Sequence, residues 1–463
     1  MADGTKVDVV VVGAGIAGLA AALEAKQAGA RVIVLEKLKS ARGNTYYSGG
    51  GCLSKISGTP EEIVSESSRT CKDRVDPELV RTFALRVNDG IDWLASMGLQ
   101  WYETVPLTGR PDRFGQDALA RLRVKGHGAA ICRIMVSAVE KEEIEVRYQT
   151  EATKILTDGE GNVVGLRVKG KEREREREVE TKGIVLATGG FQGNKEMVGT
   201  YLGPGLLKAK YSGTPFNTGD GHRMALELGA QLVNMDQWHA SLRNKHRINP
   251  YPRLQYGSLL VNSQGLRFVD EVENTKDFVA KETVKQEGCR GVVIFDEGMK
   301  RFFRMGFEEH LGEYPVKGIP RVRETDLSRI ETRLLENGTL IKASSLKELS
   351  ERARIPHPNL ERTIRQYNES VTIHQGKVMR VPIETPPFYA EEVTGRFNCT
   401  LGGVRINSEA QVLNFEREAI PGLYAAGEIM GGFYYDNYQV ITGYLPVSLV
   451  FGRIAGTNAA KTR

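Results

Sequence analysis

The chain has 463 residues, of which 40% are hydrophobic and 26% charged, and its formal net charge at pH 7 is +5. These values are near the average of globular proteins, so they exclude disordered, collagen-like and coiled-coil chains. The 63 basic residues are spread along the chain, which gives no support to nucleic-acid binding. Glycine is enriched, at 51 residues, and its short runs suit turns that approach a nucleotide.

The cysteine pattern and the N-terminus argue against a secreted, metal-binding or membrane-spanning protein. No C-x-x-C pair occurs, and an odd number of cysteines suits free thiols in a reducing compartment. The apolar N-terminal run lacks a basic stretch and a cleavage site, and no segment reaches a membrane-spanning length. We expect a cytoplasmic protein with no metal site. The cysteines are Cys52, Cys71, Cys132, Cys289 and Cys399.

Residues 7–37 predict a strand, a G-x-G-x-x-G turn, a helix and a second strand. Gly13 permits the tight turn, Gly15 lets a pyrophosphate approach the helix N-terminus, and Gly18 allows close packing. Glu36 ends the second strand, where its carboxylate can accept a ribose hydroxyl. This unit predicts a dinucleotide site but does not distinguish NAD from FAD.

The stretch from residue 58 to 180 contains one helical and one β-rich segment. A Thr-x-x-Glu capping pattern and apolar spacings of three and four predict a helical insert at about 58–124. Alternation over 145–170 predicts a meander with a hairpin turn at 158–162. The alternating charges of 171–180 predict a solvated sheet edge.

Further elements follow in the second half of the chain. Residues 183–191 predict a buried strand that ends in glycines, and 258–300 predict strands with a hairpin turn at 262–265. Residues 345–372 predict two helices broken by prolines. A second glycine turn with an acid closes 419–432 and precedes a C-terminal helix. Dinucleotide features at both ends indicate that the middle of the chain is an inserted domain.

Five motifs in chain order resemble the flavoprotein superfamily of fumarate reductases and succinate dehydrogenases, the FAD-binding type 2 family. They are the opening βαβ unit, the loop Asn44–Gly50, the strand end Ala187–Phe191, the turn Thr218–Gly221 and the segment Gly422–Glu428. The resemblance spans nearly the whole chain. The branch with 3-ketosteroid Δ1-dehydrogenases and tricarballylate dehydrogenase looks closest, since no haem, iron–sulfur or flavin-carrier segment is appended.

The resemblance implies an α/β fold, with a discontinuous Rossmann-like FAD-binding domain and an inserted α+β capping domain. The FAD-binding domain would comprise 1–235 and 398–463, and the capping domain 236–397, with the substrate between them. The loop at 41–51 offers no histidine for a covalent flavin bond, so the resemblance implies non-covalent FAD. The implied FAD-contacting residues are Gly13, Gly15, Ala17, Gly18, Glu36, Lys37, Gly43, Asn44, Thr45, Ser48, Gly49, Gly50, Gly51, Thr188, Gly189, Gly190, Asp220, Gly427, Glu428, Ser448 and Leu449.

The family reaction moves a hydride between the flavin and a carbon beside an electron-withdrawing group, while a side chain moves a proton. Gln237–His239 resembles the family's Gln-x-His, whose histidine holds a substrate carboxylate; a structural histidine is the alternative. Lys276 is the nearest match to the proton-transfer residue, with Thr275 or Asn274 as alternatives. Glu271 of the same motif suits a positioning role.

The last loop bears on the substrate class. No Arg, Lys or His lies between Glu428 and Phe451, so a two-carboxylate clamp has little support. Tyr438 matches the ketone-binding tyrosine of ketosteroid dehydrogenases, and its hydroxyl could stabilise an enolate. Cys399 stands where the family has a substrate-binding histidine, and we expect it to be a buried small residue. The expected substrate contacts are Gln237, Tyr438, Thr442 and Gly443.

These observations predict an FAD-dependent oxidoreductase that desaturates the CH–CH bond beside the carbonyl of a cyclic ketone or keto acid. Tyr438, Lys276 and His239 are the catalytic candidates. The alternative is an enoate reductase of the fumarate or urocanate type, and a third possibility is a flavin-binding electron-transfer subunit. The expected partners are a small-molecule substrate and an unidentified electron acceptor or donor.

Overall fold

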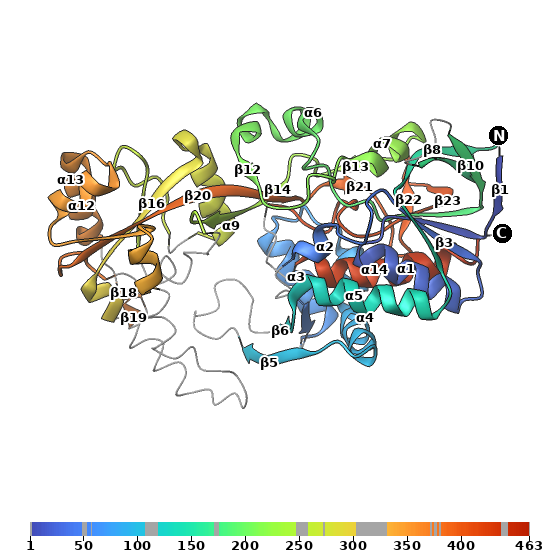
Figure 1. Cartoon of the computed structure of the whole chain (residues 1–463), viewed down its shortest axis with the longest axis horizontal. Helices are drawn as coiled ribbons and strands as arrows, with labels where there is room; N and C mark the ends of the chain where they lie inside the picture. Colours follow the sequence, from blue (N-terminus) through green and yellow to red (C-terminus); the bar gives the residue numbers. More distant parts are fainter. Residues whose placement is uncertain are drawn as a thin grey trace. The chain divides into compact units, whose positions relative to one another are not determined.

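The computed structural model describes residues 2–48, 53–56, 58–106, 119–170, 176–246, 258–271, 274–301, 331–370, 373–374, 377–378, 381–436 and 443–462. The chain divides into two compact units (Figure 1). Unit 1 comprises Met1–Gly203, Gly213–Trp238 and Cys399–Arg463, and unit 2 comprises Pro204–Ser212 and His239–Asn398.

A six-stranded sheet forms the centre of unit 1, in the order β22-β23-β11-β2-β3-β7. Strands β2, β3 and β11 consist mainly of β-branched residues and leucine, and they are buried on both faces. This pattern is typical of a parallel sheet covered by helices. All neighbours pair in parallel except β22 and β23. The strands are β2 (Val9–Val12), β3 (Val32–Glu36), β7 (Glu145–Tyr148), β11 (Gly183–Leu186), β22 (Gln411–Leu413) and β23 (Ala419–Ala425).

Small residues let helices α1 (Ile16–Gln27) and α14 (Tyr444–Ala459) pack side by side (Figure 1). A Cβ atom on Gly452 would lie 2.4 Å from the backbone oxygen of Ala17. These helices therefore join the first and last segments of the chain into one core, which also includes α5 (His127–Lys141).

The predicted helical insert is only partly helical. Helices α3 (Pro60–Thr70) and α4 (Pro77–Ser96) form as expected, and Thr59 and Glu62 make a capping box on α3. The prediction is wrong for 101–106 and 119–124, which are strands β5 and β6. They pair with each other and with β4 (Leu53–Ile56). Because the paired strands are separated in the sequence, no local pattern of residues predicts that they pair.

A second sheet of unit 1 has the order β1-β10-β9-β8. The predicted hairpin is confirmed, with Asp158 accepting bonds from the turn that joins β8 and β9. Two predictions are wrong: β7 belongs to the central sheet, and β10 lies between β1 and β9 instead of at an edge. Cross-strand charge pairs such as Arg167–Glu178 let the charged β10 occupy this position. These strands are β1 (Ala2–Lys6), β8 (Thr150–Thr157), β9 (Val163–Gly170) and β10 (Arg177–Glu180).

Unit 2 is built on a sheet around the long strand β20 (Phe388–Thr400), which pairs with β12, β14, β16 and β17. The two predicted helices are confirmed as α12 (Leu346–Ala353) and α13 (His357–Glu369). The all-strand prediction for 258–300 is wrong, because α9 (Lys276–Lys285) begins at the side-chain cap of Thr275. The remaining strands are β12 (Lys210–Tyr211), β14 (Trp238–Arg243), β15 (Leu259–Val261), β16 (Arg290–Asp296), β17 (Leu340–Ala343), β18 (Ile373–His374) and β19 (Lys377–Val378).

Five further short elements belong to unit 1. They are α2 (Asn44–Tyr47), α6 (Lys195–Met197), α7 (Asp220–Glu227), β13 (Leu232–Val233) and β21 (Gly403–Val404).

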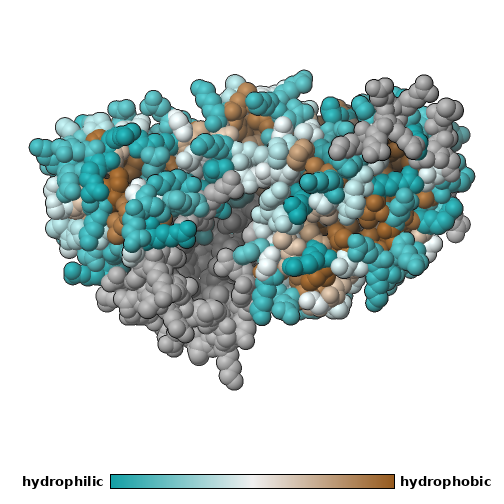
Figure 2. Space-filling view, viewed as in Figure 1, coloured by the Kyte–Doolittle hydropathy of each residue, from teal (hydrophilic) through white to brown (hydrophobic). Residues whose placement is uncertain are grey.

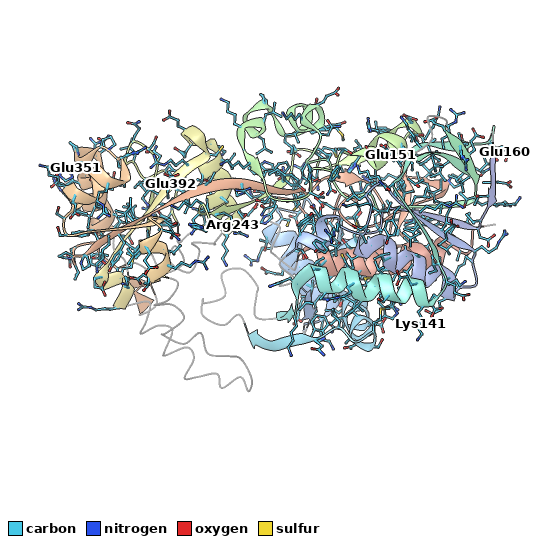
Figure 3. The ribbon with its side chains drawn as sticks, in the orientation of Figure 1. Lys141, Glu151, Glu160, Arg243, Glu351 and Glu392 are labelled. Atoms are coloured by element: carbon cyan, nitrogen blue, oxygen red, sulfur yellow. The ribbon has the colours of Figure 1, made fainter. Side chains whose placement is uncertain are left out.

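Charged side chains cover much of the surface of both units. Figure 2 shows hydrophilic residues on the visible face of each unit. In Figure 3, Lys141, Glu151 and Glu160 of unit 1 and Glu351 and Glu392 of unit 2 are such exposed side chains. No helix in the described ranges is long and apolar enough to cross a membrane.

Candidate functional site

The glycine turn after β2 has the conformation that the sequence predicts. Gly13 has a φ of +108°, and a Cβ atom there would lie 2.3 Å from the backbone oxygen of Ala187. A Cβ atom on Gly18 would lie 1.8 Å from the oxygen of Gly13. Gly15 is the N-cap of α1. Gly13 and Gly18 leave no room for a side chain, and Gly15 starts the helix. Backbone N–H groups can therefore approach an anion at the N-terminus of α1.

Glu36 lies against this turn at the end of β3. Its two carboxylate oxygens accept bonds from the backbone N–H groups of Ala14 and Leu38, each at 2.8 Å. Burial raises the pKa of Glu36, and these two bonds oppose that shift. The carboxylate therefore shapes the turn, and its role toward a ribose stays a prediction.

The segment 43–48 packs onto the N-terminus of α1. The hydroxyl of Thr45 accepts a 3.1 Å bond from the backbone N–H of Ile16. Asn44 accepts a bond from the backbone N–H of Thr214 at 3.1 Å and donates to Glu428 at 3.0 Å. Asn44 thus links three segments that are far apart in the sequence.

A buried carboxyl group, that of Glu428, lies at the centre of a polar cluster in unit 1. Asn44, Gln192, Asn217 and the backbone N–H of Thr400 all donate to it. Burial raises the pKa of Glu428 to about 7, although its bonds to Asn44, Thr400 and Gln192 oppose that shift. The group therefore changes its charge near neutral pH.

Buried polar atoms without a partner surround this cluster. The hydroxyls of Thr188 and Thr400 and the side-chain oxygen of Gln192 are buried and make no hydrogen bond in the structure. Burying such atoms unpaired is costly, so they fit a bound molecule with many polar groups. Gly190 lies among them, since a Cβ atom there would meet Thr400 Oγ1 at 2.2 Å and Gln192 Oε1 at 2.7 Å. These residues fit the hydroxyl- and phosphate-rich FAD.

Two further predicted residues, Lys37 and Asp220, form an ion pair. Lys37 Nζ lies 2.6 Å from Asp220 Oδ2 and 2.7 Å from Thr218 Oγ1. Burial raises the pKa of Asp220, but the bond to Lys37 and its charge outweigh this effect, so the pKa is lowered. Asp220 is thus an anion held at the start of α7.

The C-terminal residues of the predicted set meet α1. Gly427 has a φ of +89°, and its Cβ position lies 3.1 Å from Ala17 and 3.2 Å from Ser448 Oγ. Ser448 and Leu449 are buried in α14, whose N-cap is Gly443. The structure therefore brings the described members of the predicted FAD set to a few neighbouring segments of unit 1. Gly49, Gly50 and Gly51 lie outside the described residues.

Unit 2 contains a buried charge cluster that includes His239. The ring atom Nδ1 of His239 lies 2.6 Å from Asp277 Oδ1, which also accepts the backbone N–H of Ala240 at 2.7 Å. Lys281 Nζ lies 2.8 Å from Asp277 Oδ2. Burial raises the pKa of Asp277, but the charges of His239 and Lys281 outweigh it, so the pKa is lowered. Asp277 is therefore an ionised partner of the ring at neutral pH.

The proton-transfer candidates lie at the start of the same helix. Lys276 is the first residue of α9 and is half-buried. The hydroxyl of Thr275 caps this helix by accepting the N–H of Phe278, and Asn274 donates to the backbone oxygen of Asp270. Lys276 remains the nearest match to the family motif, with Thr275 and Asn274 as its alternatives.

The other predicted residues have structural partners or are not described. Glu271 is buried and accepts bonds from Arg267 and from the N–H of Leu260. The amide oxygen of Gln237 accepts the N–H of Asp436 at 3.1 Å, and Cys399 is a buried thiol. Tyr438 and Thr442 lie outside the described residues, so their roles stay predictions.

Sequence reasoning missed Gln192, Asn217 and Thr400 at the Glu428 cluster and Asp277 and Lys281 beside His239. Gln192 and Thr400 each stand within two residues of a predicted motif, which is a weak signal. Asp277 and Lys281 are spaced four apart on α9, so they share one face. That spacing alone does not indicate which residue the face meets.

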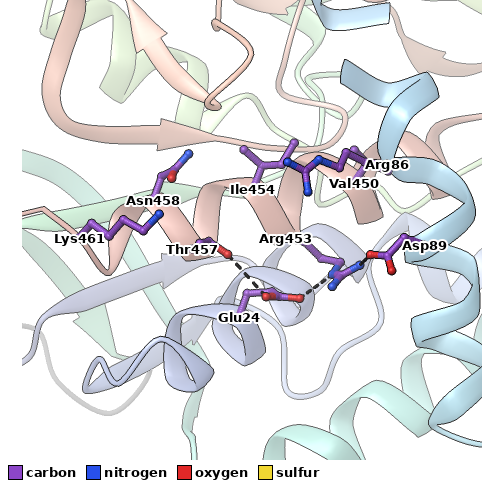
Figure 4. A pocket seen from close by; sticks show the side chains of 9 residues that line it. All are labelled: Glu24, Arg86, Asp89, Val450, Arg453, Ile454, Thr457, Asn458 and Lys461. Atoms are coloured by element: carbon purple, nitrogen blue, oxygen red, sulfur yellow. Dashed lines mark hydrogen bonds and ion pairs between the residues drawn. The ribbon is translucent and has the colours of Figure 1, made fainter. Parts of the chain in front are cut away.

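Unit 1 also contains a pocket of about 250 Å³ (Figure 4). It is lined by parts of α1, α4 and α14. Its acids Glu24 and Asp89 both pair with Arg453, at 2.5 and 2.7 Å. None of the predicted site residues lines it, so the pocket adds nothing to the candidate site.

Comparisons with known proteins agree with this geometry. A family model described as FAD binding domain matches residues 8–439. The chain is 30% identical over 472 residues to "Fumarate reductase (cytochrome)" of Shewanella frigidimarina, covering 98% of this chain and 77% of that protein. It is also 30% identical to "Urocanate reductase" of Eggerthella lenta, covering 98% and 75%. The solved 3-ketosteroid-Δ4-(5α)-dehydrogenase of Rhodococcus jostii RHA1 has a TM-score of 0.75 at 24% identity, covering 100% and 98%; this likeness shows the fold.

Proposed function

We infer a function from the premise that this chain belongs to the FAD-binding flavoprotein family of the fumarate reductases and succinate dehydrogenases. It binds FAD and is an FAD-dependent oxidoreductase of the CH–CH group. Within this class we propose that it reduces a carbon–carbon double bond conjugated to a carboxylate. This proposal reverses the order predicted from the sequence, which places desaturation of a ketone first and reduction of an enoate second.

One observation carries the proposal: His239 is buried and held by an ionised aspartate. Asp277 holds Nδ1 of the ring, and we assign the other ring nitrogen, Nε2, to the substrate. Such a ring can donate to a substrate carboxylate, and a charge-assisted bond of this kind is strong. The two reductases at 30% identity, whose names specify fumarate and urocanate, support a substrate with a carboxylate.

The chain's own residues divide the work as follows. The chemistry that FAD would supply when bound is hydride transfer to one carbon of the double bond. His239 orients the substrate by its carboxylate, and Lys276 donates the proton to the neighbouring carbon. The Glu428 cluster and the glycine turn hold the cofactor. The electron donor that reduces FAD is a separate partner.

Desaturation of a ketone is the second candidate, and a sequence feature favours it. The stretch between Glu428 and Phe451 has no Arg, Lys or His, while Tyr438 offers a hydroxyl for a ketone oxygen. In that reaction the ketone would be oxidised and FAD reduced, so the two candidates require opposite directions of electron flow.

Anaerobic visible spectra of the purified holoenzyme separate the two. We expect dithionite-reduced enzyme to be reoxidised by fumarate, urocanate or but-2-enoate. Bleaching of the oxidised enzyme by a saturated cyclic ketone, with no response to any enoate, would instead establish the dehydrogenase and overturn the proposal.

Variants test the residue assignments. We expect His239→Asn to raise KM for the enoate more than it lowers kcat, and Lys276→Ala to lower kcat by roughly 10² to 10⁴. His246→Asn is the matched control, because His246 is an exposed histidine of unit 2. Full turnover of both variants with FAD bound would refute the assignments.

We propose that the FAD is held without a covalent bond. The loop that would carry a tethering histidine contains none. Acid precipitation of the holoenzyme should therefore release the yellow colour into the supernatant. A yellow pellet would show a covalent link through another residue.

A further inference from the structure

The carboxyl group of Glu428 is buried and, among the described residues, accepts hydrogen bonds only from uncharged groups. The residue is 8% exposed. Three side-chain amides and one backbone N–H group donate to it, those of Asn44, Gln192, Asn217 and Thr400. A carboxylate at this place is therefore a buried anion without a cation partner, which is costly. A protonated carboxyl group avoids this cost and adds an O–H donor.

The titratable side chains on neighbouring segments do not balance a charge on Glu428. Asp220 pairs with Lys37 at 2.6 Å and with the exposed Arg223 at 2.8 Å. His222 on α7 is buried, and burial lowers its pKa to about 4, so its ring is neutral at pH 7. Burial raises the pKa of Glu428 to about 7, and among the described residues only hydrogen bonds to uncharged groups oppose this shift.

The atoms that fit FAD surround this carboxyl group. Thr188, Thr400 and Gln192 each carry a buried oxygen atom without a hydrogen-bond partner. A Cβ atom on Gly190 would lie 2.8 Å from Glu428 Oε1. The pyrophosphate group of FAD is negatively charged, and binding of FAD removes water from the cluster. Both effects disfavour a carboxylate nearby, so a neutral carboxyl group and the bound cofactor stabilise each other.

We propose that the carboxylate of Glu428 takes up one proton when FAD binds, so that the affinity for FAD falls as the pH rises above neutrality. The proton comes from the buffer and forms one O–H bond, and no electron is transferred. Protonation and FAD affinity are thus linked at one residue. The inference concerns retention of the cofactor, so it does not depend on the substrate or the direction of the proposed reaction.

Release of FAD from the holoenzyme measures this linkage without turnover. The holoenzyme is diluted in series at pH 6, 7 and 8 and at constant ionic strength, and the fluorescence of free FAD at equilibrium gives Kd. Because the pKa of the carboxyl group without FAD is about 7, we expect Kd to rise about tenfold from pH 6 to pH 8. A Kd that changes by less than about twofold over this range would overturn the inference.

Substitution of Glu428 assigns the linkage to this residue. Glu428→Gln has no titratable group and keeps an acceptor oxygen and hydrogen-bond donors, as the protonated carboxyl group does. Its Kd should stay within about twofold between pH 6 and pH 8. Glu160→Gln removes an exposed carboxyl group of unit 1 and should keep the rise of about tenfold. An equal rise of Kd in Glu428→Gln and in the wild type would refute the assignment.

Infrared spectra of the holoenzyme at pH 8 detect the proton itself. The difference spectrum of wild type minus Glu428→Gln should contain the C=O band of a protonated carboxyl group. The difference spectrum of wild type minus Glu160→Gln should contain carboxylate bands instead. Carboxylate bands in the first spectrum would show that Glu428 is ionised in the holoenzyme, which contradicts the inference.

The outcomes separate this inference from the proposed function. A result that overturns the role of Glu428 leaves the reduction of enoates untouched, since that reaction is followed with FAD bound. Failure of every enoate to reoxidise the reduced enzyme overturns the proposed function alone. If Glu428→Gln retains no FAD, the rise of Kd with pH must still appear in the wild type and in Glu160→Gln, or the inference fails.

Discussion

At the residue scale, the carboxyl group of Glu428 makes the stability of FAD-free protein depend on pH. Its pKa is raised from 4.5 to about 7 because it is buried. The folded chain therefore binds more protons than the unfolded chain between these values, and stability falls as pH rises through this window. The loss amounts to about 2 to 3 kcal/mol.

The variant Glu428→Gln tests this origin of the pH dependence. It removes the titration but keeps an acceptor oxygen for Asn44. Urea unfolding at pH 4.5 to 7.5 should show a shallower decline for the variant than for the wild type. The exposed Glu160→Gln variant should follow the wild type, and parallel curves for wild type and Glu428→Gln would contradict the assignment.

Gly190→Ala tests how closely the polar cluster is packed. The added methyl group would lie 2.2 Å from Thr400 Oγ1 and 2.8 Å from Glu428 Oε1. We expect a loss of about 1 to 3 kcal/mol in unfolding free energy, together with weaker FAD binding. Gly159→Ala has nothing within 4 Å of its Cβ position and serves as the control; equal effects of the two would refute the packing argument.

At the element scale, the contact of α1 with α14 depends on small residues. Gly452→Ala improves helix propensity by about 1 kcal/mol, but its methyl group would lie 2.4 Å from the backbone oxygen of Ala17. Backbone atoms in a packed helix pair cannot move away, so we expect a net loss of about 1 to 3 kcal/mol in urea unfolding.

A second helical glycine provides the comparison for Gly452. The nearest atom to a Cβ on Gly90 in α4 is a side-chain methyl of Leu449, at 3.3 Å. A side chain can adjust, so Gly90→Ala should change stability by less than about 1 kcal/mol. A larger loss for Gly90→Ala than for Gly452→Ala would show that side-chain packing, not backbone approach, limits α14.

At the scale of the whole molecule, the predicted FAD site draws on segments from both ends of the chain. The described members of its predicted site are Asp220 and residues within 13–48, 188–190 and 427–449, all in unit 1. Removal of FAD should lower the melting temperature, and free FAD at a hundredfold excess over its Kd should restore about 2.7 kcal/mol. Scanning calorimetry with and without FAD measures this, and an unchanged melting temperature would show that the site is not coupled to folding.

The predictions that were confirmed rest on short-range patterns. The glycine spacing after β2 predicted the turn at Gly13, because a φ of +108° is readily available only to glycine. The proline-broken helices α12 and α13 and the Asp158 turn were likewise predictable from a few consecutive residues. The resemblance to the flavoprotein family is confirmed over residues 8–439.

The predictions that failed concern pairing between distant segments. The central place of β10 required the N-terminal β1 as its other neighbour, and β5 and β6 required each other. The sequence predicts strands where α9 forms, because the capping threonine of this helix follows a β-rich segment. Local composition does not specify which strand a charged or alternating segment will meet.

The amino-acid sequence by itself determined the dinucleotide turn, the α/β class and the family, because each depends on residue types at fixed local spacings. Only the tertiary structure decided that Asn44, Gln192 and Asn217 converge on Glu428 and that Asp277 lies beside both His239 and Lys281. Protonation of a buried group depends on desolvation and on charges brought near by folding. Those distances exist only once the chain has packed.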